Sequence, residues 1–228
     1  MSAWADRLSI PFDVAPYRLS GAVYGTLLNH RSALAALGEA VNRPPYGAAP
    51  KAPVLYIKPR NTLAGPGDAV VIPAEVAEVE VGASVGLVMG RTACGVSESR
   101  AMDYVAGYLI VADVSVPHSS YHRPSIRLKA RDGYCPMGPA VTARAANADA
   151  LIVRTYVDGV LVQSADMGEL IRPPPRLLAD VTEFMTLMPG DVLTLGAAGP
   201  APRVRAGQTV RIDVEGLGSL SNPFRAAA

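Results

Sequence analysis

The residues of this sequence that could carry chemistry gather around one apolar strand and the polar loop that follows it. The strand GYLIVADVS, residues 107–115, carries Asp113 near its end. The loop KARDGYCPMGP, residues 129–139, contains Lys129, Arg131, Asp132, Cys135 and two prolines. Sheet proteins commonly place a site where a polar loop leaves an apolar strand. We therefore expect the functional side chains to meet at this end of the strand.

Asp113 is the first candidate, because an ionised carboxylate at the end of a buried strand needs a cation as its partner. That cation could be a metal ion or the side chain of a lysine or arginine. Lys129 is the expected partner, since the polar loop returns toward the same end of the sheet. The pattern alone favours a salt bridge over a metal ligand.

Two further pairs of charged residues could take part in a site. Glu78 and Glu80 are two residues apart on a predicted strand and share a face, which is the geometry of a two-carboxylate clamp for a hard cation. Alternating glutamates are more often a solvated strand face. Lys58 and Arg60 lie in a basic turn and could either hold an anionic substrate or be solvated.

The elements that must position these residues are mostly strands. Alternating and β-branched patterns predict strands at 17–28, 54–63, 69–73, 75–90, 107–115, 192–196 and 209–220, and a hairpin over 150–163 that turns at Asp158-Gly159. Two helices are predicted, at 30–41 with Asn29 as N-cap, and between the prolines at 173–175 and Pro189. His30 is expected to be solvated in the first helical turn. We expect an α+β fold in a single domain, residues 1–228.

Composition excludes several classes of function. The net charge of +1 gives no electrostatic reason to expect nucleic acid or a membrane surface as partner. No apolar run approaches the roughly 20 residues that span a bilayer. The first ten residues lack the pattern of an export signal, and two cysteines are too few for a disulfide framework. The expected location is the cytoplasm.

Several motifs in succession resemble the fumarylacetoacetate hydrolase family. They are DYVAGYLIVADVS, KARDGYCPMGP, IVRTYVDGVLVQ, EFMTLMPGDVLTLG and TVRIDVEGLGSLSN, and together they cover nearly the whole chain. Within the family, GTLLNH, PPYGAAPKAPVLYIKPRNT and EVGASVGLVMGRTA resemble the amino-terminal half, or separate first subunit, of the bacterial isomerase/decarboxylases of 4-hydroxyphenylacetate (homoprotocatechuate) degradation.

The resemblance implies a mixed β-roll and a small dicarboxylate or tricarboxylate substrate bearing a 2-oxo-enoate group. It also implies a Mg²⁺ or Mn²⁺ ion that chelates the 2-oxo acid and stabilises the enolate formed as carbon dioxide leaves. An acid or base then moves a proton along the conjugated system. The expected partner is a second copy of the chain or a homologous second subunit.

The residues of the family site carry over incompletely. The family has Glu-x-Glu on one strand and Asp on the next; the Asp falls on Asp113, but the glutamates fall on Gly82 and Ser84. The His and Glu of the lid helix fall on Ala33 and Ala36. The Gly-Thr-Pro loop becomes Gly196-Ala197-Ala198. The resemblance therefore predicts Lys129 and Asp132 as catalytic residues, Asp113 and Glu80 as metal ligands, and substrate contacts by Lys58, Arg60 and Gly196.

Three interpretations follow. The chain could be an active isomerase/decarboxylase in which Glu80 reaches the metal from a position about 6.6 Å short of residue 82. It could instead be a structural partner, inactive alone, of an intact subunit that carries the full carboxylate set. It could also be a family hydrolase or decarboxylase acting on another 2-oxo acid, which the missing carboxylates and the KPRNT turn argue against.

Overall fold

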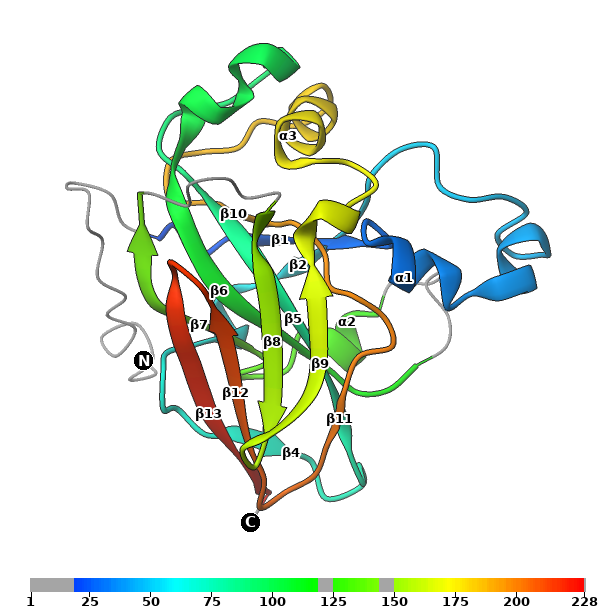
Figure 1. The fold of residues 1–228 in the computed structure, drawn as a ribbon, viewed down its shortest axis with the longest axis vertical. Coiled ribbons are helices and arrows are strands. Elements are labelled where there is room, and N and C mark those ends of the chain that lie inside the picture. The colour runs from blue at the N-terminus through cyan, green and yellow to red at the C-terminus, as the bar shows by residue number, and fades with distance from the viewer. Residues whose placement is uncertain (1–18, 119–124, 144–149, 228) are drawn as a thin grey trace.

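Two sheets make up most of the fold in the computed structural model, which describes residues 19–118, 125–143 and 150–227 (Figure 1). The larger sheet has eight strands, in the order β2-β1-β10-β5-β6-β7-β3 with β11 paired to β5, and the smaller has the order β4-β13-β12-β8-β9. The strands are β1 Val23–Leu27, β2 Val54–Lys58, β3 Leu63–Ala64, β4 Val70–Ile72, β5 Val79–Met89, β6 Val105–Ser115, β7 Cys135–Thr142, β8 Ile152–Val157, β9 Val160–Asp166, β10 Val192–Thr194, β11 Arg203–Val204, β12 Thr209–Val214 and β13 Gly218–Ala226.

The helices are short and lie at the margins of the sheets (Figure 1). They are α1 Arg31–Ala35, α2 Ile126–Lys129 and α3 Pro174–Thr182, with 3₁₀ turns at Gly38–Asn42 and Glu98–Tyr104 among others. Parallel pairs (β1 with β10, β3 with β7, β4 with β13) occur beside antiparallel ones. The expected α+β class and the mixed, strand-rich architecture are confirmed.

The two long strands β5 and β6 form the centre of the larger sheet and position the site. Apart from Glu80 and Asp113, their residues are mostly apolar or small on both faces, and nearly all are buried, as expected for strands covered on each side. The core between the two sheets includes Val81, Val85 and Ile110 of these strands and Ile212 of β12. Each such side chain contributes about 1.5–3 kcal/mol when fully buried.

The register of β5 and β6 fixes which side chains are neighbours at the site. Gly82 pairs with Asp113 and Glu80 pairs with Ser115 across the antiparallel ladder. Residues two apart on a strand share a face. The side chains of Glu80, Asp113 and Ser115 therefore project from the same region of the sheet.

The predicted hairpin is confirmed, since β8 and β9 pair antiparallel around Asp158-Gly159. Both turn residues have positive φ, 50° and 84°, which is what a tight two-residue hairpin turn requires and what Asp-Gly supplies. Strands at 54–58, 70–72, 79–89 and 105–115 also agree with the prediction.

The predictions for the first helix were wrong in three respects. α1 ends at Ala35, and a 3₁₀ turn at Gly38–Asn42 follows it, beginning at Gly38 with φ 50°. The N-cap is His30, whose Nδ1 accepts from the backbone N–H of Ser32. His30 is buried, not solvated, and Asn29 instead bonds the carbonyls of Arg172 and Leu195.

Other boundaries also differ from the predictions. α3 ends at Thr182, well before Pro189. The segment CPMGP, predicted as loop, begins strand β7, which pairs with β6 and β3. The strand predicted at 17–28 begins at Val23 in the structure. Residues 17 and 18 of that prediction, like the first ten residues of the chain, lie outside the described residues.

In the part of the chain that the structure describes, no helix is long and apolar enough to cross a membrane.

Candidate functional site

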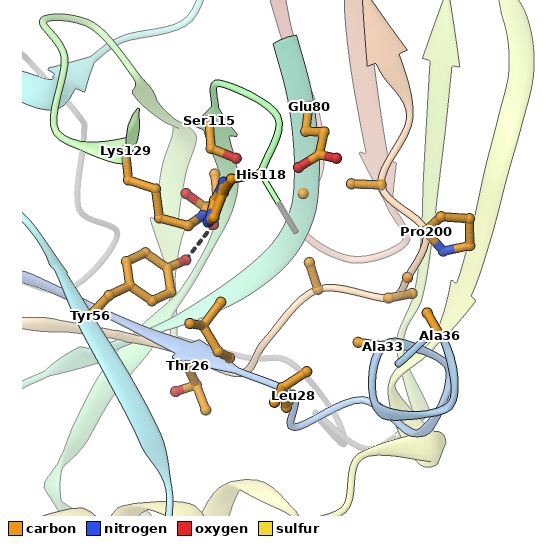
Figure 2. A pocket seen from close by; sticks show the side chains of 17 residues that line it. Thr26, Leu28, Ala33, Ala36, Tyr56, Glu80, Ser115, His118, Lys129 and Pro200 are labelled. Carbon is orange, nitrogen blue, oxygen red and sulfur yellow. Dashed lines mark hydrogen bonds and ion pairs between the residues drawn. The ribbon is translucent and has the colours of Figure 1, made fainter. Parts of the chain in front are cut away.

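A cavity of about 180 Å³ opens at the end of β6, where the sequence places its polar cluster. Figure 2 shows Tyr56, His118 and Lys129 on one side of it and Ala33, Ala36 and Pro200 on the other. The remaining lining residues are Thr26, Leu27, Leu28, Glu80, Gly82, Asp113, Ser115 and Ala197, Ala198, Gly199 and Ala201. The cavity therefore has a charged side and an apolar side.

Asp113 lies at the centre of the charged side and is bound by two lysines. Its Oδ1 lies 2.8 Å from Lys58 Nζ, and its Oδ2 lies 2.7 Å from Lys129 Nζ. The hydroxyl of Tyr56 donates to the same Oδ2 at 2.5 Å. Burial would raise the pKa of Asp113, but the ammonium groups of Lys129 and Lys58 hold this pKa well below its usual range. The predicted pairing of Asp113 with Lys129 is confirmed.

Lys58 does not take the exposed, substrate-facing position that its sequence context suggested. It is 1 % exposed and does not line the cavity. Besides its ion pair with Asp113, its Nζ donates to the carbonyl oxygens of Val114, Lys129 and Tyr134 at 2.6–2.8 Å. These bonds use all the donors of an ammonium group. Lys58 therefore holds β2, β6 and the turn before β7 together and has no donor left for a substrate.

The charge of Lys58 follows from its partners. Burial lowers its pKa, and the Asp113 carboxylate opposes that shift. Four oxygen acceptors surround Nζ, whereas a neutral amine has only two N–H bonds to offer. The contacts therefore favour the ammonium form.

Tyr56 orients the carboxylate and covers Lys129. Its ring lies 4.5 Å from Lys129 Nζ, a distance that allows a cation–π contact. Burial and the neighbouring Asp113 raise the pKa of Tyr56 well above its ordinary value, so the phenol stays protonated and can donate. Glycine is required at position 25 on β1, because a Cβ there would lie 1.9 Å from Tyr56 Cζ.

The residues present do not fit a hard divalent cation. Such an ion takes several oxygen ligands, but positions 82 and 84 are glycine and serine, and each oxygen of Asp113 already lies within 2.8 Å of a lysine ammonium. Among the described residues there is no group of three His, Cys, Asp or Glu side chains that could hold a metal. Two ammonium groups and one carboxylate also leave a net positive charge, which repels a cation.

Glu80, predicted as a substitute metal ligand, does line the cavity but already has a cation. Its Oε1 lies 3.0 Å from Arg203 NH2, contributed by β11. Arg203 also contacts Glu78, at 3.3 Å, and so links the two glutamates of this strand face. The structure thus gives Glu80 an arginine partner in place of the predicted metal.

Three other predicted site residues lie outside the cavity lining. Arg60 is exposed and donates to the backbone carbonyl of Ser20. Asp132 is exposed in the turn before β7, where it accepts from the side chain of Asn61 at 2.7 Å. Gly196 borders the lining residue Ala197, and its carbonyl accepts from Ser84 Oγ. Neither Arg60 nor Asp132 lines the cavity, so their positions do not support the predicted roles in substrate binding and catalysis.

The cavity also contains polar residues that sequence reasoning missed. Tyr56 is two positions before Lys58 on β2, and Ser115 is two positions after Asp113 on β6. This spacing on a strand is a signal that could have identified both. His118 follows the end of β6, and its Nδ1 lies 2.9 Å from the carbonyl oxygen of Val116. Cys135 is buried, which raises the pKa of its thiol to about 12, so it is no nucleophile near neutral pH.

The model of the fumarylacetoacetate hydrolase C-terminal domain matches residues 22–225, almost the entire described chain. The chain belongs to this family. It is 40% identical over 205 residues to the 4-hydroxyphenylacetate degradation bifunctional isomerase/decarboxylase of Escherichia coli, a match that covers 90% of this chain and 47% of that protein. The chain thus spans about half the length of this relative.

Solved structures of family members share the fold. The 5-carboxymethyl-2-hydroxymuconate delta-isomerase of Mycobacterium smegmatis superposes with a TM-score of 0.80 at 30% identity, covering 94% of this chain and 82% of that one. The 2-hydroxyhepta-2,4-diene-1,7-dioate isomerase of Mycobacterium marinum gives 0.78 at 28% identity, covering 92% and 77%. The family fold is therefore shared although the cluster at Asp113 does not fit a metal.

Proposed function

We propose that this chain is the metal-free half of a 4-hydroxyphenylacetate-degradation isomerase/decarboxylase, and that it works with a homologous half carrying a complete carboxylate set. The proposed reactions are decarboxylation of 5-oxopent-3-ene-1,2,5-tricarboxylate and isomerisation of 2-hydroxyhepta-2,4-diene-1,7-dioate. The observation that carries the proposal is the match of 90% of this chain to 47% of the E. coli isomerase/decarboxylase. A protein of that length has room for a second unit of this size.

The geometry of the cavity supports the assignment of the metal to the other half. An isomerase/decarboxylase of this type needs a Lewis acid for the developing enolate, whereas Asp113 here is neutralised by Lys58 and Lys129. The alternative in which Glu80 completes a metal site is disfavoured by its ion pair with Arg203. A second copy of this chain would bring the same lysine-paired carboxylate, so a homologous half with intact glutamates is preferred over a homodimer.

The test is to assay the chain alone, the homologous half alone and the two expressed together, with Mg²⁺ or Mn²⁺ supplied. We expect co-elution as one complex and decarboxylase turnover by the complex. Replacing the Glu-x-Glu pair of the homologous half by glutamines should abolish that turnover. Turnover by this chain alone at about 1 per second or more, a rate typical of enzymes, would contradict the proposal.

A further inference from the structure

The chain contains few lysines and places two of them in one buried cluster. Of the 21 lysines and arginines in the sequence, only Lys51, Lys58 and Lys129 are lysines. Lys51 is exposed, whereas Lys58 and Lys129 are 1 % and 5 % exposed and both contact the carboxylate of Asp113. A chain that otherwise carries its positive charge on arginine therefore has lysine at both positions beside this carboxylate.

Lysine offers a reaction that arginine does not. A guanidinium stays protonated in proteins, but an ammonium group can lose its proton, and the resulting amine is a nucleophile for carbonyl carbons. Lys58 is unsuited to this role, because Asp113 and three carbonyl oxygens surround its Nζ and it does not line the cavity. Lys129 does line the cavity, with its Nζ 2.7 Å from Asp113 Oδ2 and 4.5 Å from the centre of the Tyr56 ring.

Loss of a proton from Lys129 leaves the charges of the cluster balanced. When both lysines are protonated, two buried positive charges share the single carboxylate of Asp113. When Lys129 is neutral, Lys58 and Asp113 remain as a one-to-one ion pair, 2.8 Å apart. Burial and the neighbouring Asp113 raise the pKa of Tyr56 well above its ordinary value, so this phenol adds no charge. Because burying a charge is costly unless it is paired, the neutral amine is compatible with this cluster.

The cavity beside Lys129 has room for a small organic molecule. Its volume of about 180 Å³ is below the roughly 300 Å³ at which drug-sized ligand pockets begin. Lys129 lies on the polar side of the cavity, and Ala33, Ala36 and Pro200 lie on the opposite side (Figure 2). These apolar side chains suit a short hydrocarbon chain. The cavity therefore fits an aldehyde or ketone of a few carbon atoms, with its carbonyl group toward Lys129.

We propose that Lys129 is a nucleophile that forms a reversible imine with a small aldehyde or ketone bound in this cavity. The ammonium group first gives one proton to solvent. Nζ then adds to the carbonyl carbon, one N–H proton passes to the oxygen, and the hydroxyl leaves with the other N–H proton as water. This balance includes no oxidant, reductant or metal. Once protonated, the imine withdraws electrons from the neighbouring carbon, as a Lewis acid does at a metal site.

This inference goes beyond the proposed function, because imine formation requires neither the homologous half nor a metal ion. Capture of a carbonyl compound is also not turnover. The two-half enzyme is judged by co-elution and by decarboxylase activity, whereas the imine is judged by chemical labelling of the isolated chain. Failure of one proposal is therefore distinct from failure of the other.

The experiment traps the imine with cyanoborohydride, which reduces it to a stable amine, and maps the labelled lysines by mass spectrometry. The probe is propanal, given in a short pulse to the isolated chain near neutral pH in excess EDTA. Lys51 reports the reactivity of an exposed amine, and Lys58 reports labelling through opening of the fold. Lys129 should be labelled about fivefold faster than Lys51 although it is far less exposed, and Lys58 should stay unlabelled. Labelling of Lys129 no faster than that of Lys51, or at the same rate as that of Lys58, would overturn the inference.

A pair of variants tests whether propanal reaches Lys129 through the cavity. Ala36 is exposed and lines the side opposite Lys129, so substitutions there leave the cluster untouched. Ala36→Trp fills part of the cavity and should lower the ratio of Lys129 to Lys51 labelling by about fivefold, whereas the matched control Ala36→Ser should leave this ratio unchanged. Equal ratios in the two variants would contradict binding of the probe in this cavity.

A measurement without reductant tests the imine itself. Propanal labelled with ¹³C at its carbonyl carbon should give an imine signal by NMR with the wild type and with Lys51→Arg. Lys129→Arg keeps a positive charge beside Asp113 but has no primary amine, so it should fold and lose this signal. An imine signal of wild-type strength from folded Lys129→Arg, judged by its melting curve, would show that Lys129 is not the nucleophile.

Discussion

Lys58→Met should lower the free energy of unfolding by about 3–5 kcal/mol, one of the two largest effects expected for any single substitution in the cluster. The substitution removes the ammonium group that donates to the carbonyl oxygens of Val114, Lys129 and Tyr134. These three buried oxygens are then left without that hydrogen-bond donor. Each unsatisfied buried group costs about 1–3 kcal/mol, partly recovered by local rearrangement. Chemical denaturation measures the change directly.

The matched control is Lys51→Met, which removes the same kind of side chain from an exposed position. It should change stability by no more than about 0.5 kcal/mol. For a chain of this size a loss of 3–5 kcal/mol corresponds to a fall in melting temperature of roughly 6–20 °C. If Lys58→Met and Lys51→Met had the same melting temperature, the structural role assigned to Lys58 would be wrong.

Asp113→Asn should destabilise the fold by a comparable amount, about 3–5 kcal/mol, because it leaves two buried ammonium groups without their carboxylate. The loss should persist in excess chelator, since the partner of Asp113 is lysine and not metal. The control is Asp132→Asn, an exposed carboxylate with one bond from Asn61, which should be nearly neutral. Equal melting of wild type and Asp113→Asn in chelator would refute this account of the cluster.

The effect of Asp113→Asn should also depend on pH. The lysines hold the pKa of Asp113 in the folded state below its unfolded value of about 3.9. As the pH falls below that value the unfolded chain takes up a proton first, so the stabilisation by ionised Asp113 is present above about pH 4 and declines below it. The stability gap between wild type and Asp113→Asn should therefore narrow only in acid.

Strand periodicity predicted the scaffold well, because β5, β6 and the β8–β9 hairpin are set by local patterns that burial reinforces. The Asp113–Lys129 pair was also predictable, since a carboxylate on an apolar strand must meet a cation. The helix predicted at 30–41 ends at Ala35, and the positive φ of Gly38 keeps the α-helix from resuming, which an apolar stripe alone does not reveal.

The candidate site was only partly predictable, because tertiary contacts decide which polar side chains face inward. In the sequence, Lys58 is a basic residue near a predicted turn. In the structure, its Nζ donates to three carbonyl oxygens of residues 56–76 positions further along the chain. Asp132 is close to Lys129 in sequence, but the turn before β7 exposes it. The pairing of Glu80 with Arg203 depends on β11 adding to β5, a two-residue contact without a sequence signal.

The central claim is that the cluster of Lys58, Asp113 and Lys129 forms a site of net positive charge in place of a metal site. The most direct test is a calorimetric titration of the purified chain with Mn²⁺ near pH 7.5. One retained carboxylate, already paired, predicts no saturable binding up to about 1 mM. Binding of one ion per chain in the low micromolar range would contradict the claim.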